Sequence, residues 1–282
     1  MPENYWSARQ GRGPKANPSD ADLFRFIRLT IDETNAKGHL DEWFGRACVD
    51  EVDPRGRAGV TLKDHIYMTL GYHDLYPLDE TWPMLNTAQT VEDAMFDLIE
   101  YLHDHVSEGV KGGAGYQHNY NNCGYHYSIF DPNPAQAFLR NRVNPLLQNY
   151  KDGFRLSDKG RIEHVGPDGL DQLMDQTILS DDEFIVQQVR HAIALYRSRT
   201  RTVEDQRSAV VALAGVLERL RPSIRAEMLK GDERALFQLA NEFQVRHALR
   251  NQKDNYEKPL WLSWMFYVFL STIHLITRIG ER

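Results

Sequence analysis

Residues 233–279 read ERALFQLANEFQVRHALRNQKDNYEKPLWLSWMFYVFLSTIHLITRI, and this stretch decides the fold. Its first half predicts a helix that runs into a polar loop rich in Arg, His, Asn, Gln and Lys. Its second half has no formal charge from Leu260 to Thr277, and Pro259 stands where proline favours the first turn of a helix. A helix that is apolar all round is typical of the centre of a helical bundle. The stretch therefore predicts a helical C-terminal domain with a polar cluster directly before its last helix.

The apolar segment also permits a second interpretation, a single membrane anchor. Its 18 uncharged residues reach the lower length limit for a membrane-spanning helix. Against an anchor, Ser263, Ser271 and His274 interrupt the segment, and no positive cluster stands just before Pro259. We therefore expect a buried helix and no membrane partner.

The composition limits the classes of protein to consider. The chain has 282 residues, of which 41% are hydrophobic and 26% are charged, close to globular averages. Its net charge of -7 means that a surface for nucleic acid must be a local basic patch. Cys48 and Cys123 are the only cysteines, and the Met-Pro-Glu start lacks the features of a signal peptide. These features favour a cytoplasmic location.

Turn-rich stretches divide the chain into three parts. Residues 1–20 predict a loosely held arm, because Gly, Pro, Asn and Ser dominate them. Residues 21–179 predict a mostly helical domain, interrupted by a β-hairpin near 154–165 with Gly160 placed for a positive φ. Residues 180–282 predict helices only. The expected fold class is mainly α, with the N-terminal helical domain and its hairpin followed by a four-helix bundle.

Capping residues mark the helices of the second domain. Ser180 with Glu183 three residues later predicts a capping box, and Thr202 predicts the cap of the next helix. A third helix begins near Asp232, and Pro259 opens the fourth. Short connections between four helices indicate an antiparallel bundle.

The polar cluster before the last helix carries groups suited to phosphate chemistry. Guanidinium groups bind phosphate through charged donor pairs, and imidazole transfers protons near neutral pH. Metal-free RNA cleavage needs these groups, because a base must take the ribose 2′-hydroxyl proton while cations stabilise the phosphoryl oxygens. The structural alternative is a polar interhelix loop whose Arg246 pairs with an acidic neighbour. The residues assigned to catalysis are Arg246 and His247, and those assigned to RNA or phosphate binding are Arg250, Asn251, Gln252, Lys253 and Tyr256.

This cluster resembles part of the HEPN superfamily of prokaryotic RNases and nucleotide-associated proteins. The family's usual motif is Arg, a polar residue, four to six positions and then His, placed before the last long helix of a four-helix domain. Arg246-His247 matches the first half, but residues 251–253 contain no His. Residues 180–282 also resemble a C-terminal segment of bacterial proteins related to abortive-infection, or anti-phage, modules. The resemblance implies a homodimer with two polar clusters across a shared cleft for RNA.

The loop from Tyr116 to Asp131 is a second candidate site, dense in tyrosine, histidine and asparagine. Asn122, Tyr125 and His126 would line a pocket for a base or nucleotide by stacking and hydrogen bonding. Cys123 and His126 have C-x-x-H spacing, but no second ligand pair accompanies them, so no metal site is predicted. Alternatively, the loop's aromatic residues pack the N-terminal domain against the bundle.

The leading hypothesis from the sequence is a prokaryotic defence or toxin-type protein. Its HEPN-like helical domain would bind RNA. The incomplete motif leaves open whether it also cleaves RNA as a metal-independent endoribonuclease. No cofactor is expected. The alternative is a non-catalytic interaction or nucleotide-sensing protein that uses the bundle to dimerise. Five arginines around a predicted helix-helix turn either help to bind RNA or form a solvated face; they are Arg190, Arg197, Arg199, Arg201 and Arg207.

Overall fold

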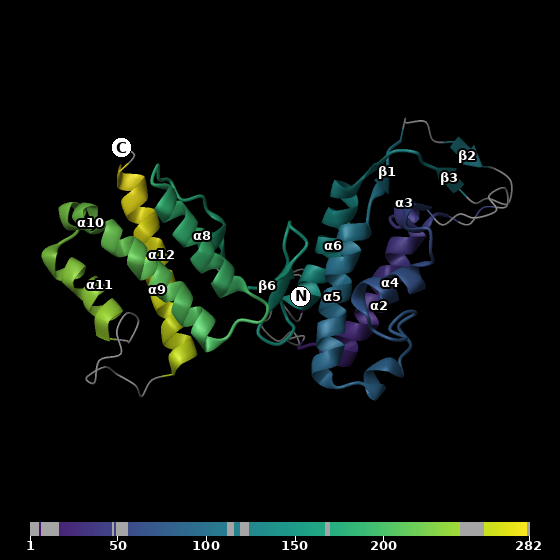
Figure 1. Cartoon of the computed structure of the whole chain (residues 1–282), viewed down its shortest axis with the longest axis horizontal. Helices are drawn as coiled ribbons and strands as arrows, with labels where there is room; N and C mark the ends of the chain where they lie inside the picture. The colour runs from purple at the N-terminus through teal and green to yellow at the C-terminus, as the bar shows by residue number, and fades with distance from the viewer. Residues whose placement is uncertain are drawn as a thin grey trace. The chain divides into compact units, whose positions relative to one another are not determined.

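The chain is mainly α-helical, as the sequence predicts, in a computed structural model that describes residues 6, 17–46, 48, 56–111, 116–118, 124–166, 170–242 and 257–280. It divides into two compact units, Met1–Glu163 and His164–Arg282 (Figure 1). Each unit has its own cluster of buried apolar side chains. The units are therefore described one at a time.

The first unit is built on three long helices. Helix α5 has nine buried residues, and α2 packs against both α5 and α6. Ser19 caps α2 with a capping box. Thr87 caps α5, because its hydroxyl accepts the Thr90 amide. The helices of this unit are α2 (Asp20–Ala36), α3 (Asp41–Phe44), α4 (Leu62–Leu70), α5 (Ala88–His105) and α6 (Pro132–Leu147), with 3-10 turns η1 (Gly56–Ala58) and η2 (Trp82–Leu85).

Three small strand pairs accompany these helices. The predicted hairpin is confirmed, with β5 (Phe154–Leu156) paired to β6 (Ile162–His164) and Gly160 at a φ of 74°. The segment that the sequence assigned to a loop, Tyr116 to Asp131, contains one antiparallel pair and one strand of a second pair. In the first, β2 (Tyr116–His118) pairs with β3 (Gly124–His126). In the second, β1 (Glu108–Gly109) pairs with β4 (Phe130–Asp131).

The second unit is a helical bundle in which α9 packs against both α8 and α12 (Figure 1). Tyr196 of α8 stacks on Phe266 of α12 with ring centroids 3.9 Å apart, which joins the outer helices of this trio. Thr202 caps α9 with a capping box, as predicted. The helices are α7 (Asp171–Asp175), α8 (Glu183–Arg197), α9 (Val203–Arg219), α10 (Arg221–Glu227), α11 (Lys230–Glu242) and α12 (Lys258–Gly280).

Two helix starts in this unit differ from the sequence prediction. The cap of α8 is Asp182, whose carboxylate accepts the Phe184 amide, while Ser180 accepts the amide of Asp182 itself. Helix α10 is a further helix that the sequence did not predict. Pro222 lies in its first turn, where the amide that proline lacks would have no partner within the helix.

The boundary between the units lies after Glu163, whereas the sequence placed it near residue 180. Helix α7 accounts for the difference. Met174 belongs to the apolar core of the second unit, and the carbonyl of Leu173 accepts a hydrogen bond from His274 of α12 at 3.1 Å. Helix α7 thus folds with the bundle.

Helix α12 is only partly the buried helix that the sequence predicts. Its buried side chains include Phe266, Leu270 and Ile273. One face is open, with Leu260 65% and Leu275 51% exposed. In length and apolar composition, this is the one helix among the described residues that would be able to cross a membrane.

Candidate functional site

The residues assigned to RNA chemistry lie outside the described parts of the chain. The structure describes the chain as far as Glu242 at the end of α11, and again from Glu257 at the start of α12. The predictions for this segment are therefore untested. They concern Arg246, His247, Arg250, Asn251, Gln252, Lys253 and Tyr256.

The described chain directly after that segment carries an exposed aromatic pair. Trp261 is 41% exposed and Trp264 is 45% exposed. Their ring centroids lie 5.6 Å apart with the rings nearly perpendicular, a favourable edge-to-face arrangement. An apolar surface therefore begins where the polar segment ends. The sequence did not predict it, because the helix appears apolar on every side.

The run of five arginines is largely engaged within the second unit. Arg197 is buried and donates to Asp175 at 2.7 Å and to Asp171 at 3.2 Å. The guanidinium of Arg201 lies over the Tyr196 ring and donates to the Tyr196 carbonyl. These two arginines serve the bundle's own packing, which supports a structural role for that part of the run.

Arginines at the α9–α10 end of the same unit are paired with carboxylates as well. Arg221 and Arg225 both donate to Glu233, at 3.3 Å and 2.9 Å. The hydrogen bond from Arg225 is the main cause that lowers the pKa of Glu233. Arg219 pairs with Asp182, which caps α8. Much of the cationic charge on the described surface of this unit is thus neutralised internally.

The second candidate site, in the loop between Tyr116 and Asp131, is described in part. Tyr125 and His126 are half-buried, while Asn122 lies outside the described residues. The Tyr125 and Tyr127 rings contact each other at 4.8 Å, and the Tyr127 ring covers Gly109 so closely that a side chain there would collide with it. Tyr125 and Tyr127 thus pack within the first unit.

His126 lies near an ion pair of α3. Burial raises the pKa of Asp41, and the neighbouring Arg46 and His126 oppose that rise. Arg46 binds Asp41 at 2.8 Å. No group of three or more possible metal ligands occurs within the described residues.

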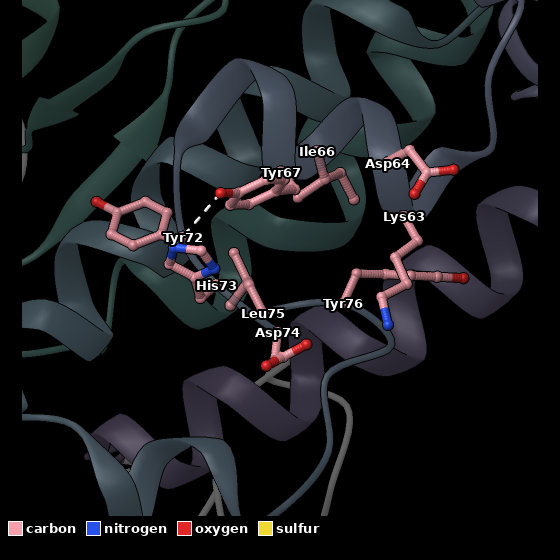
Figure 2. A pocket seen from close by; sticks show the side chains of 9 residues that line it. All are labelled: Lys63, Asp64, Ile66, Tyr67, Tyr72, His73, Asp74, Leu75 and Tyr76. Carbon is pink, nitrogen blue, oxygen red and sulfur yellow. Dashed lines mark hydrogen bonds between the residues drawn. The ribbon is translucent and has the colours of Figure 1, made fainter.

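A cavity whose lining the sequence did not single out lies in the first unit (Figure 2). It has a volume of about 180 Å³ and lies between α4 and the loop that follows this helix. A cavity of about 150 Å³ can hold one benzene-sized ring, so this one has room for a single small ring. Its lining residues are Lys63, Asp64, Ile66, Tyr67, Tyr72, His73, Asp74, Leu75 and Tyr76.

Buried leucines fix the loop that forms one wall of this cavity. Leu75 and Leu78 are buried in the core of the first unit, at 1% and 0% exposure. Asp74 and Leu78 have φ values of 53° and 64°, in the left-handed region that side chains other than Gly seldom adopt. The indole of Trp82 also donates to the His73 carbonyl at 2.9 Å. The core thus holds a strained backbone that turns polar side chains outwards.

The cavity combines aromatic walls with charges of both signs. Tyr67 and His73 contact each other through their rings, and a 3.4 Å contact joins the Tyr67 hydroxyl to Nε2 of His73 (Figure 2). Burial raises the pKa of Tyr76, so its phenol stays protonated and able to donate. No ion pair joins Lys63 or Asp74 to another described residue. The lining therefore suits a small polar ring compound and contains no arrangement of nucleophile and base.

A second group that the sequence missed lies between α3, α4 and α5. The Tyr101 phenol contacts Nδ1 of His65 at 2.8 Å, and Nδ1 of His105 donates to the Tyr101 carbonyl at 2.7 Å. The two imidazole centroids are 5.1 Å apart, and Trp43 packs edge-on against His105. Burial lowers the pKa of His105, which favours its neutral form. These contacts pack α3 and α4 onto α5.

No protein-family model, curated protein or solved structure matches this chain.

Proposed function

We propose that this chain is an RNA-binding protein of the prokaryotic defence or toxin type, which binds through residues 246–256. The observation that carries the proposal is one of charge. Segment 243–256 contains Arg246, Arg250 and Lys253 against the single carboxylate of Asp254, in a chain whose net charge is -7. Cation-rich segments bind phosphate backbones by releasing counterions.

The ion pairs of the second unit support this assignment. Arg197 and Arg221 are already bound to carboxylates of the same unit. They would have to break these contacts before binding a phosphate. The segment before α12 is therefore the favoured place for RNA.

Binding is proposed ahead of cleavage. Arg246 and His247 provide a charged donor and a proton-transfer group, but the histidine that ends the HEPN-like motif has no counterpart at residues 251–253. We propose Arg246 as the main phosphate contact, with His247 as the base if cleavage occurs. Neither role requires a cofactor.

The test compares RNA binding by matched arginine variants. Fluorescence anisotropy with a labelled single-stranded RNA should show weaker binding by Arg246→Ala and by Arg250→Ala than by the unchanged protein. Each lost phosphate contact should reduce the slope of log affinity against log salt by about 0.7. Arg207→Ala is the control, because Arg207 pairs with Glu204 in the same unit.

Cleavage is measured in the same samples on denaturing gels. Fragments that disappear in both Arg246→Ala and His247→Ala would support the ribonuclease. Intact RNA with arginine-dependent binding supports binding alone. The absence of binding at low salt would refute the whole proposal.

The second candidate function is a non-catalytic interaction protein that forms a homodimer through the bundle. The open face of α12 favours it, because Leu260 and Trp264 are large apolar side chains left 65% and 45% exposed. Exposed apolar patches of this kind are typical of interaction surfaces. Arg246→Ala would leave such self-association unchanged, which separates the two functions.

A further inference from the structure

A set of exposed positions forms one stripe along α12 and the residue directly before it, and the exposed Trp261 lies beside this stripe. Glu257, Trp264, Ser271 and Arg278 follow one another at intervals of seven residues, and all four are exposed. Leu260 and Leu275 lie between them and are also exposed. A seven-residue repeat keeps side chains on one face of a helix that packs against another helix. We call these six residues, five in α12 and Glu257 directly before it, the outer face of α12.

The outer face of α12 has the same spacing in both directions. From Glu257 the steps run three residues to Leu260 and four to Trp264, and from Arg278 they run three residues back to Leu275 and four to Ser271. The positions therefore form pairs about a centre between Tyr267 and Val268. Each pair is complementary: an acid with a base, a leucine with a leucine, and a large side chain with a small one.

We propose that the outer face of α12 binds the same face of a second copy of this chain, with the two helices antiparallel. A two-fold axis through the centre of the stripe brings each position against its complement, as an isologous interface requires. Glu257 of one copy then lies opposite Arg278 of the other. The Trp264 ring fills the space left by the short side chain of Ser271. This inference rests on the homodimer of the second candidate function.

A parallel pair fits the same residues poorly. It would place Arg278 against Arg278 and Trp264 against Trp264, which joins like charges and crowds two indoles at one level. In the antiparallel pair, the opposite charges of Glu257 and Arg278 at the ends of the stripe attract each other. Among the described residues, Arg278 donates to Gln176 of its own unit at 2.7 Å. Charge complementarity therefore favours the antiparallel arrangement.

The two end charges also have a local explanation, which the experiment must separate from pairing. A carboxylate at a helix start and a guanidinium at its last turn both interact favourably with the helix dipole. Reversing the charges at both ends of one helix worsens both local interactions. It leaves the attraction between antiparallel copies intact, because each pair still joins opposite charges.

The size of the contact sets the expected affinity. The stripe spans 21 residue steps, about 32 Å of helix, and one helix pair buries less than the roughly 800 Å² per partner of a standard interface. We expect a dimer with a dissociation constant in the micromolar range, about 1 to 100 μM.

Sedimentation velocity over a concentration series tests the charge pairing. Glu257→Arg and Arg278→Glu should each weaken the dimer by about tenfold, since the two-fold axis repeats each change. The double variant E257R/R278E should have a dissociation constant within about threefold of that of the unchanged protein. Trp264→Ala should weaken the dimer by at least about thirtyfold. Circular dichroism confirms that each variant keeps its helix content.

Cysteine cross-linking tests the direction of the pair, in a background with Cys48 and Cys123 changed to Ser. Leu260→Cys alone should not cross-link in an antiparallel pair, because the two copies of residue 260 lie about 22 Å apart along the helices. L260C/L275C should cross-link, since a disulfide needs Cα atoms within about 7 Å. In a parallel pair, Leu260→Cys alone would cross-link.

Three outcomes would overturn the inference. They are a monomer at all concentrations, a double charge reversal that fails to restore the dimer, and cross-linking by Leu260→Cys alone. A monomer that sediments with phosphatidylcholine vesicles would show that the stripe binds lipid, provided that Trp264→Ala no longer sediments with them. RNA binding that depends on Arg246 is measured separately, so loss of the dimer and loss of RNA binding are distinct results.

Discussion

Arg197 has a different role from the other arginines near it in the chain. Only 8% of it is exposed, and it joins Asp171 and Asp175 of α7 to the end of α8. Replacing one member of a buried ion pair costs about 3 to 5 kcal/mol because the partner charges stay behind. Asp175 is 49% exposed, which reduces that cost. We expect Arg197→Ala to lower the free energy of unfolding by about 2 to 3 kcal/mol, measured by urea denaturation.

Arg207→Ala is the matched control for this change. The Arg207 side chain is 25% exposed and pairs at 3.6 Å with Glu204, which is 77% exposed. Exposed ion pairs contribute about 0 to 1 kcal/mol. If Arg197→Ala and Arg207→Ala lowered the free energy of unfolding equally, the structural role of Arg197 would be contradicted.

Single arginines show what a sequence leaves open at this scale. The pattern around residues 190–207 predicts a basic run but not which members are buried, since Asp171 and Asp175 lie more than twenty residues away from Arg197. The candidate cavity was missed for a similar reason. Tyr72, His73 and Asp74 have no periodic pattern, and only the burial of Leu75 and Leu78 turns them outwards.

His103 predicts a pH dependence of stability in the first unit. It is buried on α5, and Nη1 of Arg140 lies 3.3 Å from its Nε2, so that nitrogen must accept. Burial is the main cause that lowers the pKa of His103, Asp104 raises it, and Arg140 lowers it further. The folded unit therefore binds fewer protons than the unfolded chain, in which histidine titrates near about 6.5.

The sign of the effect follows from this proton difference. The contribution of neutral His103 to the free energy of unfolding is fully present above about pH 6.5. It is lost as the pH falls below that value. Urea denaturation between about pH 7.5 and pH 5.5 should show falling stability, and His103→Gln should flatten this fall. Exposed His73, changed to Gln, is the control. An unchanged slope in His103→Gln would contradict the prediction.

At the scale of elements, two glycines predict opposite effects of one substitution. Gly160 turns the β5–β6 hairpin at a φ of 74°, and a Cβ there would collide with the His103 ring. Gly215 lies inside α9, where a Cβ would meet nothing within 4 Å. We expect Gly160→Ala to lower the free energy of unfolding of the first unit by at least about 2 kcal/mol. Gly215→Ala should raise the free energy of unfolding of the second unit by about 1 kcal/mol. Thermal unfolding checks both, and a stable Gly160→Ala variant would contradict the hairpin geometry.

Local signals predicted most helices because their causes are local. Ser19 and Thr202 bond to amides three residues away, and the apolar face of α5 repeats along one helix. Pairs between distant segments were not predicted. The β1–β4 pair joins residues about twenty positions apart, and neither two-residue strand has a pattern of its own. The open face of α12 was missed because a uniformly apolar helix does not show which side lacks a neighbour.

At the scale of the whole molecule, the boundary at Glu163 makes α7 part of the second unit. The sequence placed the division near residue 180, after α7, but three contacts oppose it. They are the buried Met174 side chain, the hydrogen bond from His274 to the Leu173 carbonyl, and the pairing of Arg197 with α7 carboxylates. A sequence shows the turns and not these distant partners.

Two C-terminal fragments test where the second unit begins. His164–Arg282 keeps α7, whereas residues 180–282 leave Arg197 without Asp171 and Asp175 and remove Met174 from the core. Losing a buried Met and a buried ion pair costs about 2 to 5 kcal/mol each. We expect the longer fragment to unfold in one cooperative transition. The shorter one should unfold at a clearly lower urea concentration or fail to fold. Equal midpoints for the two fragments would place the boundary near residue 180 and make α7 dispensable to the bundle.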